Sequence, residues 1–210
     1  MTRPTLISVF VFGMMGVNAS AAIFVDNFDL YGDYTQYLDS TDNARVYTEG
    51  YWPAGPTHYW APISRSDWGE VVYKYDLPFS IESASIDASI LALTWHDSTA
   101  EGYLDVSPNG VDWTQVLTAG LNSFIDPIDV TSYLAGSDTA YIRARLRSRN
   151  SPIGAQFLRT TPNPNNPQTQ APEVYEFRAE GANVVPEPST FVIFATLATL
   201  GIAWGWWRRR

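Results

Sequence analysis

The chain has 210 residues, no cysteine and a formal net charge of −9, with 13 basic and 22 acidic residues. Four of the basic residues (Arg3 and Arg208 to Arg210) and one acidic residue (Glu187) lie in the two ends, so 9 basic and 21 acidic residues leave the part between them near −12. This charge argues against nucleic acid and anionic membrane surfaces as partners. The lack of cysteine excludes disulfides, thiolate metal ligands and cysteine nucleophiles.

The N-terminal end is typical of a secretory signal peptide, residues 1–22. Arg3 supplies a positive charge, 6–17 is a short apolar run, and 18–22 offers small residues to signal peptidase. Such a run is too short for a stable membrane span. We expect cleavage after Ala21 or Ala22, followed by one domain over 23–183, because about 160 residues suffice for a single hydrophobic core.

Within this domain the pattern predicts an all-β fold, because short runs of strand-forming residues recur at intervals of about ten residues between turn residues. The expected strands are 22–28, 70–76, 85–96, 102–106, 112–117, 141–148, 155–159 and 174–179. A Pro- and Asn-rich loop is expected at 160–172, and one capped helical turn at 129–136. The fold class predicted is a single β-sandwich of jelly-roll type.

Two places in this pattern indicate a change of direction. Near Ser89 the inward-facing parity of 85–96 changes, which indicates a bulge or a strand covered on both faces. Ser107-Pro108-Asn109-Gly110 is a cluster of turn residues. It predicts a hairpin between 102–106 and 112–117, with the backbone at positive φ in the Asn109-Gly110 turn.

Aromatic rings gather between residues 47 and 68, in a segment interrupted by prolines. They are Tyr47, Tyr51, Trp52, His58, Tyr59, Trp60 and Trp68. Flat rings on proline-stiffened loops suit stacking against sugar C–H faces, so Tyr51, Trp52, Tyr59 and Trp60 are candidate carbohydrate contacts. The alternative is that these rings close one end of the core. We expect Trp68 in the core and Trp52 exposed.

The run 141–148 alternates most clearly, with Ile142, Ala144 and Leu146 on one face. Arginines 143, 145 and 147 lie on the other face. Guanidinium groups on one face can hold carboxylates or sulfates, so Arg143 and Arg145 are candidate contacts for an acidic polysaccharide. The alternative is ion pairing with acidic residues of neighbouring strands, such as Asp105.

Carboxylates supply a further candidate, a structural calcium site at Asp26, Asp29 and Glu176. No other cofactor is expected.

His58 and His96 are the only histidines, and the chain lacks the sequence motifs of serine hydrolases, zinc proteases and phosphate-binding loops. We therefore expect a protein that is not an enzyme. The alternative is a polysaccharide-active enzyme, a β-jelly-roll lyase or a glycosidase with spatially paired carboxylates.

The C-terminal end, 184–210, has three parts. Pro186-Glu187-Pro188 holds the backbone extended, and Phe191 to Trp207 is an uncharged run of about 17 residues, just long enough to cross a bilayer at about 1.5 Å per residue. The terminal residues Arg208, Arg209 and Arg210 should remain cytoplasmic.

This order resembles the PEP-CTERM sorting signal of exopolysaccharide-producing bacteria. The resemblance implies recognition, and cleavage near Pro186-Glu187-Pro188, by an exosortase, a membrane transpeptidase-like enzyme. It also implies an inner-membrane-anchored precursor that is delivered to the cell surface or the extracellular matrix. The alternative is an ordinary C-terminal membrane anchor.

A second resemblance covers about 75–160. Five segments follow one another in the order found in galactose-binding-like jelly rolls, and the chain is similar to them in this respect. They are Leu77-Pro78-Phe79, the apolar run 86–95, the segments 105–113 and 128–134, and the strand 141–145. This resemblance implies the fold but not a ligand. We expect a structural or adhesive matrix protein whose partners are the exosortase and extracellular polysaccharide, the latter bound weakly.

Overall fold

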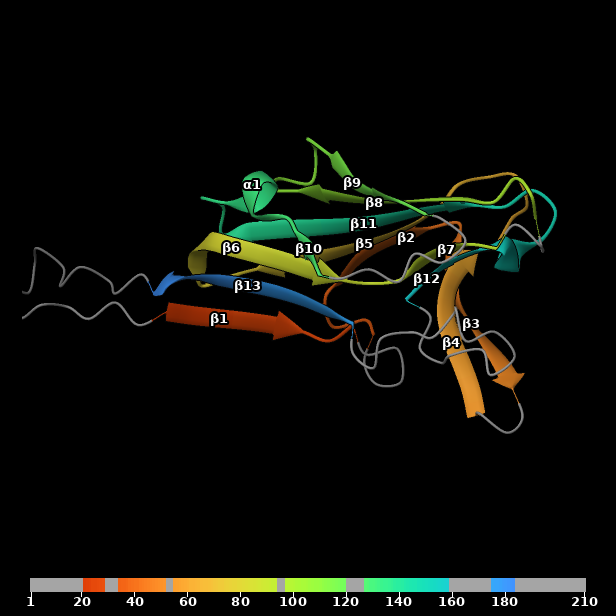
Figure 1. Cartoon of the computed structure of the whole chain (residues 1–210), viewed down its shortest axis with the longest axis horizontal. Helices are drawn as coiled ribbons and strands as arrows, with labels where there is room; N and C mark the ends of the chain where they lie inside the picture. Colours follow the sequence, from red (N-terminus) through yellow and green to blue (C-terminus); the bar gives the residue numbers. More distant parts are fainter. Residues whose placement is uncertain are drawn as a thin grey trace, which may run out of the picture.

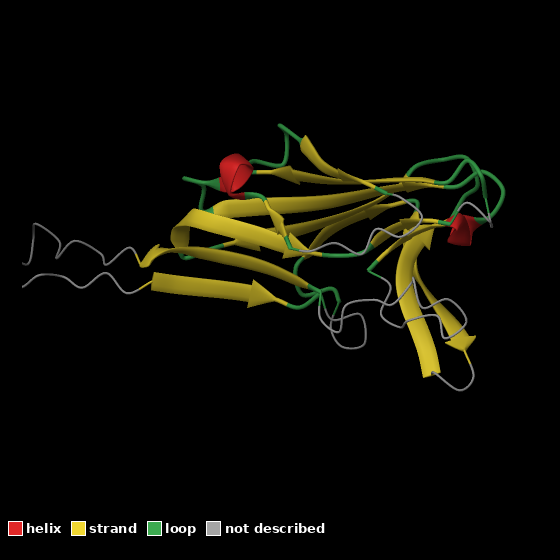
Figure 2. Cartoon of the chain, in the orientation of Figure 1, coloured by secondary structure: helices red, strands yellow, loops and turns green. Residues whose placement is uncertain are grey.

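The structure, a computed structural model, describes residues 21–28, 34–51, 55–93, 97–119, 127–158 and 175–183. Its strands are β1 (Ala21–Asp26), β2 (Leu38–Asp42), β3 (Ala44–Tyr51), β4 (Gly55–Pro62), β5 (Gly69–Asp76), β6 (Phe79–Asp87), β7 (Ile90–Ala92), β8 (Glu101–Ser107), β9 (Thr114–Thr118), β10 (Ile128–Asp129), β11 (Thr139–Arg147), β12 (Ala155–Phe157) and β13 (Glu176–Asn183). One helical turn, α1 (Thr131–Leu134), and one 3-10 turn, η1 (Pro152–Gly154), complete the described elements. The predicted all-β class is confirmed (Figure 2).

The strands form three antiparallel sheets. One has five strands in the order β2-β5-β11-β8-β9, and two have four, β1-β13-β6-β10 and β3-β4-β12-β7. The five-stranded sheet and the β1-β13-β6-β10 sheet form the two layers of a sandwich (Figure 1). The hairpin β3–β4 projects from one end of this sandwich, at the lower right of the figure. One continuous hydrophobic core joins residues of all three sheets.

Strand β11 shows why the sandwich closes. Ala140, Ile142, Ala144 and Leu146 are all buried, and they alternate with half-buried residues exactly as a period of two requires. They share the core with buried aromatic and aliphatic side chains of the neighbouring strand β5 and of the other two sheets. Each such side chain stabilises the fold by about 1.5–3 kcal/mol when it leaves water. The largest of these are Tyr73, Tyr75, Ile81, Ile86, Phe157 and Phe177.

The parity change near Ser89 has a cause different from the expected bulge. Strand β6 ends at Asp87 in one sheet, and β7 begins at Ile90 in another. Between them Ser89 is buried and donates a hydrogen bond to the hydroxyl of Tyr175 at 2.7 Å, while its carbonyl accepts from the Leu158 N–H at 2.9 Å. The chain therefore changes sheets here. The three residues of β7 are indeed covered on both faces.

The predicted hairpin is confirmed, because β8 pairs with β9 and Gly110 has a φ of 73°. Asn109 does not share the positive φ; its side chain instead accepts hydrogen bonds from the N–H groups of Val111 and Asp112, both at 2.9 Å. The helical turn is also confirmed. It is followed by Gly136 at a φ of 86°.

Several expectations lie outside the described residues. These are the signal peptide up to residue 20, the loop 160–172 and the C-terminal tail 184–210 with its apolar run. In the part of the chain that the structure describes, no helix has the length and apolar character needed to span a membrane. Ala21 and Ala22, the expected cleavage residues, begin β1 and pair with Ala182 and Gly181.

Candidate functional site

The outer face of the five-stranded sheet carries a row of arginines with acidic and aromatic neighbours. Since Ile142, Ala144 and Leu146 point into the core, the arginines between them point outward from β11. The register of the sheet sets their neighbours. On β8, Asp105 lies opposite Arg143, Tyr103 opposite Arg145 and Glu101 opposite Arg147. On β5, Glu70 lies opposite Arg145.

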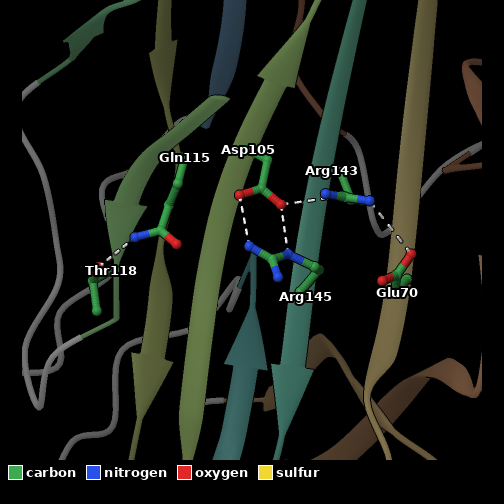
Figure 3. Close-up of polar contacts among 6 residues, drawn as sticks. All are labelled: Glu70, Asp105, Gln115, Thr118, Arg143 and Arg145. Carbon is green, nitrogen blue, oxygen red and sulfur yellow. Dashed lines mark hydrogen bonds and ion pairs between the residues drawn. The ribbon is translucent and has the colours of Figure 1, made fainter. Parts of the chain in front are cut away.

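Asp105 is the centre of this arrangement. Its side chain is only 1% exposed and accepts hydrogen bonds from two arginines (Figure 3). Arg145 donates twice, from Nε to Oδ2 at 2.6 Å and from Nη2 to Oδ1 at 3.0 Å, and Arg143 donates from Nε to Oδ2 at 3.0 Å. The hydrogen bond to Asp105 raises the pKa of Arg145. A buried carboxylate is thus paired with two fixed cations.

The remaining charges on this face are paired as well. Arg147 donates from Nη2 to Glu101 Oε2 at 2.6 Å, and Nη1 of Arg143 lies 3.9 Å from Glu70 Oε2. Three arginines therefore face three carboxylates. The alternative considered for the arginine row, pairing with acidic residues of neighbouring strands, is confirmed for Arg143 and Arg145.

Aromatic rings hold the other side of each guanidinium group. Arg143 lies 4.1 Å from the ring centroid of Trp113, Arg147 4.6 Å from that of Trp68, and Arg145 5.1 Å from that of Tyr103. Trp68 and Tyr103 also contact each other, with centroids 5.6 Å apart. All three rings are half-buried. Each stacked cation contributes about 0.5–1 kcal/mol at such partly exposed positions.

We call these residues, namely Trp68, Glu70, Glu101, Tyr103, Asp105, Trp113, Arg143, Arg145 and Arg147, the arginine–aromatic face. The edge strand β9 borders it with the exposed side chains of Gln115 and Thr118, joined by a hydrogen bond of 2.9 Å (Figure 3). The face thus combines aromatic rings of fixed orientation, paired charges and polar groups. Such a surface can stack on the C–H faces of sugars and exchange hydrogen bonds with their hydroxyls.

The rings proposed from the sequence lie elsewhere. Tyr59 and Trp60 belong to β4 and are 0% and 3% exposed. Trp60 donates from Nε1 to the Tyr73 hydroxyl at 3.0 Å, and Tyr59 donates its hydroxyl proton to Glu49 at 2.6 Å. The expectation that these two rings stand on loops and face a ligand is wrong, because both lie on a strand and are buried. The alternative, rings that belong to the core, holds for them. Trp52 and the side chain of Tyr51 lie outside the described residues.

Trp68 requires the opposite correction. We expected it in the core because it precedes a buried strand, but it is half-buried and lies under the guanidinium group of Arg147. Trp113 and Tyr103 belong to the same face and were not selected from the sequence. A signal existed for Tyr103, which shares the parity of Asp105 on one predicted strand.

Two of the three proposed calcium ligands, Asp26 and Glu176, lie in the described part of the chain. Asp26 accepts the Tyr75 hydroxyl proton at 2.7 Å, Glu176 lies on the neighbouring β13, and Asp29 lies outside the described residues. Among the residues that the structure describes, no three His, Asp or Glu side chains come together as a metal site.

Asp97 is a buried carboxylate with a structural role. It is 2% exposed and accepts five hydrogen bonds of 2.7–2.8 Å, two from Thr99, two from Asn150 and one from Ser148. Burial by itself raises the pKa of Asp97, but the hydrogen bonds from Asn150, Thr99 and Ser148 outweigh it and hold the pKa well below its usual range. The carboxylate ties the loop before β8 to the loop after β11.

A β-jelly-roll lyase, the alternative considered above, would need His58 or His96 beside an arginine and a tyrosine. His58 contacts the Thr48 hydroxyl at 3.1 Å. Alternation along β3 and β4 places this pair on one face, and Arg45, Tyr47 and Tyr59 on the other. His96 lies outside the described residues.

Comparisons with known proteins assign no family. No protein family and no curated protein matches the chain. Among solved structures, the chain is similar to the cysteine protease and lectin-like domains of Cwp84, a surface layer associated protein of Clostridium difficile, with 15% identity and a TM-score of 0.29. The match covers 66% of this chain and 36% of that one. A likeness this distant transfers neither fold nor function.

Asp105→Asn should destabilise the domain by about 1.5–3 kcal/mol, because Arg145 loses its carboxylate partner and Arg143 keeps only the longer contact to Glu70, at 3.9 Å. Glu101→Gln is the control, since Glu101 is 38% exposed and its single ion pair should contribute less than about 1 kcal/mol. Urea denaturation measures both. Equal losses in the two variants would show that Asp105 does not hold this face together.

Asp97→Asn should lower stability at neutral pH by about 1–3 kcal/mol and flatten its acid dependence. The folded pKa of Asp97 is depressed, so its contribution is present above the unfolded pKa of about 3.9 and is lost as the pH falls from there towards the folded pKa. Denaturation midpoints measured from about pH 6 to about pH 2 should therefore fall less steeply in the variant. Parallel profiles would contradict this role.

Proposed function

We propose that this chain is an exported surface or extracellular-matrix protein, structural or adhesive in role, that holds polysaccharide weakly on its arginine–aromatic face. The observation that carries the binding is the set of half-buried rings of Trp68, Tyr103 and Trp113, each held under a paired guanidinium group. The sandwich itself we assign to the galactose-binding-like jelly rolls, on the order of sequence motifs between 75 and 160.

Charge pairing decides which kind of polymer this face suits. The three arginines already bind Asp105, Glu101 and Glu70, so an anionic polymer would have to break these ion pairs to reach a guanidinium group. Each ring is half-buried, so a sugar that stacks on ring surface not covered by the guanidinium group requires no such exchange. The face therefore suits sugar rings with exposed C–H faces, and its affinity should depend little on salt.

The route to the surface rests on the two ends of the chain. We propose removal of the segment up to Ala21 or Ala22, retention by the apolar run 191–207, and cleavage near Pro186-Glu187-Pro188 by an exosortase-like enzyme. The support is the order of the three parts of the tail, which an ordinary membrane anchor does not need. The terminal arginines would hold the end of the precursor in the cytoplasm.

Trp68→Ala and Trp113→Ala should each lower the retention of the purified full chain, in non-ionic detergent, on gels that contain the producing organism's polysaccharide. The physical reason is that the contacts between the C–H face of a sugar and the aromatic ring are lost with the ring. Retention of the unaltered chain should change little between low and high salt.

Tyr133→Ala is the matched control, because Tyr133 is an exposed ring on α1, outside the arginine–aromatic face. It should leave retention unchanged. Thermal denaturation of each variant would separate loss of binding from loss of fold. Unaltered retention in both folded tryptophan variants would contradict the proposed site.

Deletion of Pro186 to Pro188 should leave an uncut precursor in the inner membrane, because the rigid segment is what the sorting enzyme would recognise and the apolar run alone only anchors. Cell fractionation and immunoblotting measure this. A double variant, Ser189→Ala with Thr190→Ala, keeps the proline segment and should be sorted normally. An unaltered chain that itself stays uncut in the membrane would favour the ordinary anchor.

A further inference from the structure

Strand β1 forms one edge of its four-stranded sheet. It pairs with β13 from Ala21 opposite Ala182 to Asp26 opposite Phe177, and no described strand pairs with its other side. It lies at the lower margin of the sandwich in Figure 1. Its outer N–H and C=O groups are therefore arranged as a template for one more strand.

This edge lacks the charged residues that the edge strands β2 and β3 carry. Residues 21–25 read Ala-Ala-Ile-Phe-Val, with no charge and no proline, and their pairing with β13 has no bulge. By contrast, β2 has exposed Asp39 and Asp42, and β3 has Arg45 and Glu49. Charges and prolines on an edge strand prevent pairing with another chain. Their absence from β1 leaves it open to such pairing.

Both faces of β1 present apolar surface at this edge. On the outer face, Ile23 is 55% and Val25 is 41% exposed. On the inner face, Phe24 is only partly buried and makes edge contacts with Tyr37 and Tyr75, at centroid distances of 5.6 and 5.5 Å. A strand added here would remove aliphatic and aromatic surface from water on both sides.

We propose that a second copy of this chain binds at this edge, through antiparallel pairing of β1 with β1 around a twofold axis at Phe24. Phe24 then lies opposite Phe24, and Ile23 lies opposite Val25 twice, so that the exposed aliphatic residues cover each other. Asp26 lies opposite Ala22, and no like charges meet. The two four-stranded sheets become one continuous sheet of eight strands.

Neighbouring registers fit less well. Moving the axis to Val25 places Phe24 opposite Asp26. Moving it to Ile23 places Val25 opposite the small Ala21 and Phe24 opposite the small Ala22. Residues 23–25 carry the proposed pairing, and they remain in the chain whether a leader is removed after Ala21 or after Ala22. The proposal does not depend on carbohydrate binding.

Disulfide cross-linking tests both the contact and its register, because the chain contains no cysteine of its own. In the proposed dimer, Cβ atoms of opposed residues 23 and 25 are about 4.5–5.5 Å apart, whereas two copies of residue 23 are diagonal neighbours about 7–8 Å apart. Under mild oxidation of the full chain in non-ionic detergent, a mixture of Ile23→Cys and Val25→Cys should therefore form covalent dimers faster than either variant alone.

If the mixture forms no cross-linked dimer, the proposal is overturned. Faster cross-linking of Ile23→Cys alone would overturn this register.

A non-covalent test uses Val25→Lys, which should raise the dimer Kd about tenfold or more because each copy brings a lysine into the interface. Val111→Lys is the matched control, since Val111 is 76% exposed on the β8–β9 turn. Sedimentation equilibrium that gives the same Kd for Val25→Lys, Val111→Lys and the unaltered chain would also overturn the proposal.

Discussion

The buried carboxylate of Asp105 is the constraint on which the arginine–aromatic face depends. A charge that is 1% exposed is strongly unfavourable unless it is paired, and here two guanidinium groups from the next strand supply the pairing. That pairing fixes Arg143 and Arg145, and Arg143 in turn lies over Trp113. The orientation of an indole ring on the surface is therefore set by an acidic residue beneath it.

Elements whose pattern is local could be predicted from the sequence. In β11 the period of two separates Ile142 and Ala144 from Arg143 and Arg145, and the pairing with Asp105 was one of two alternatives considered. The β8–β9 hairpin followed from Gly110 and its neighbours. The sheet change between β6 and β7 could not be predicted, because a parity change looks the same for a bulge and for a crossover.

The candidate site was predicted only in part. The sequence indicates Arg143 and Arg145 but not their stacking partners, because Trp113 follows a turn and reaches Arg143 only through the tertiary fold. Trp60 was selected because it lies in an aromatic cluster, yet its position on β4 directs it to Tyr73 in the core. Aromatic content indicates that rings will gather; strand register decides which of them face water.

The two proposed surfaces belong to different layers of the sandwich. The arginine–aromatic face lies on the five-stranded sheet, whereas β1 is the edge of the sheet beneath it (Figure 1). Pairing through β1 would leave both binding faces free and place two of them in one assembly. A polymer that bridges two weak sites is held more tightly than by either site alone, since the second contact forms at high effective concentration. Weak stacking on each copy would then suffice for an adhesive role.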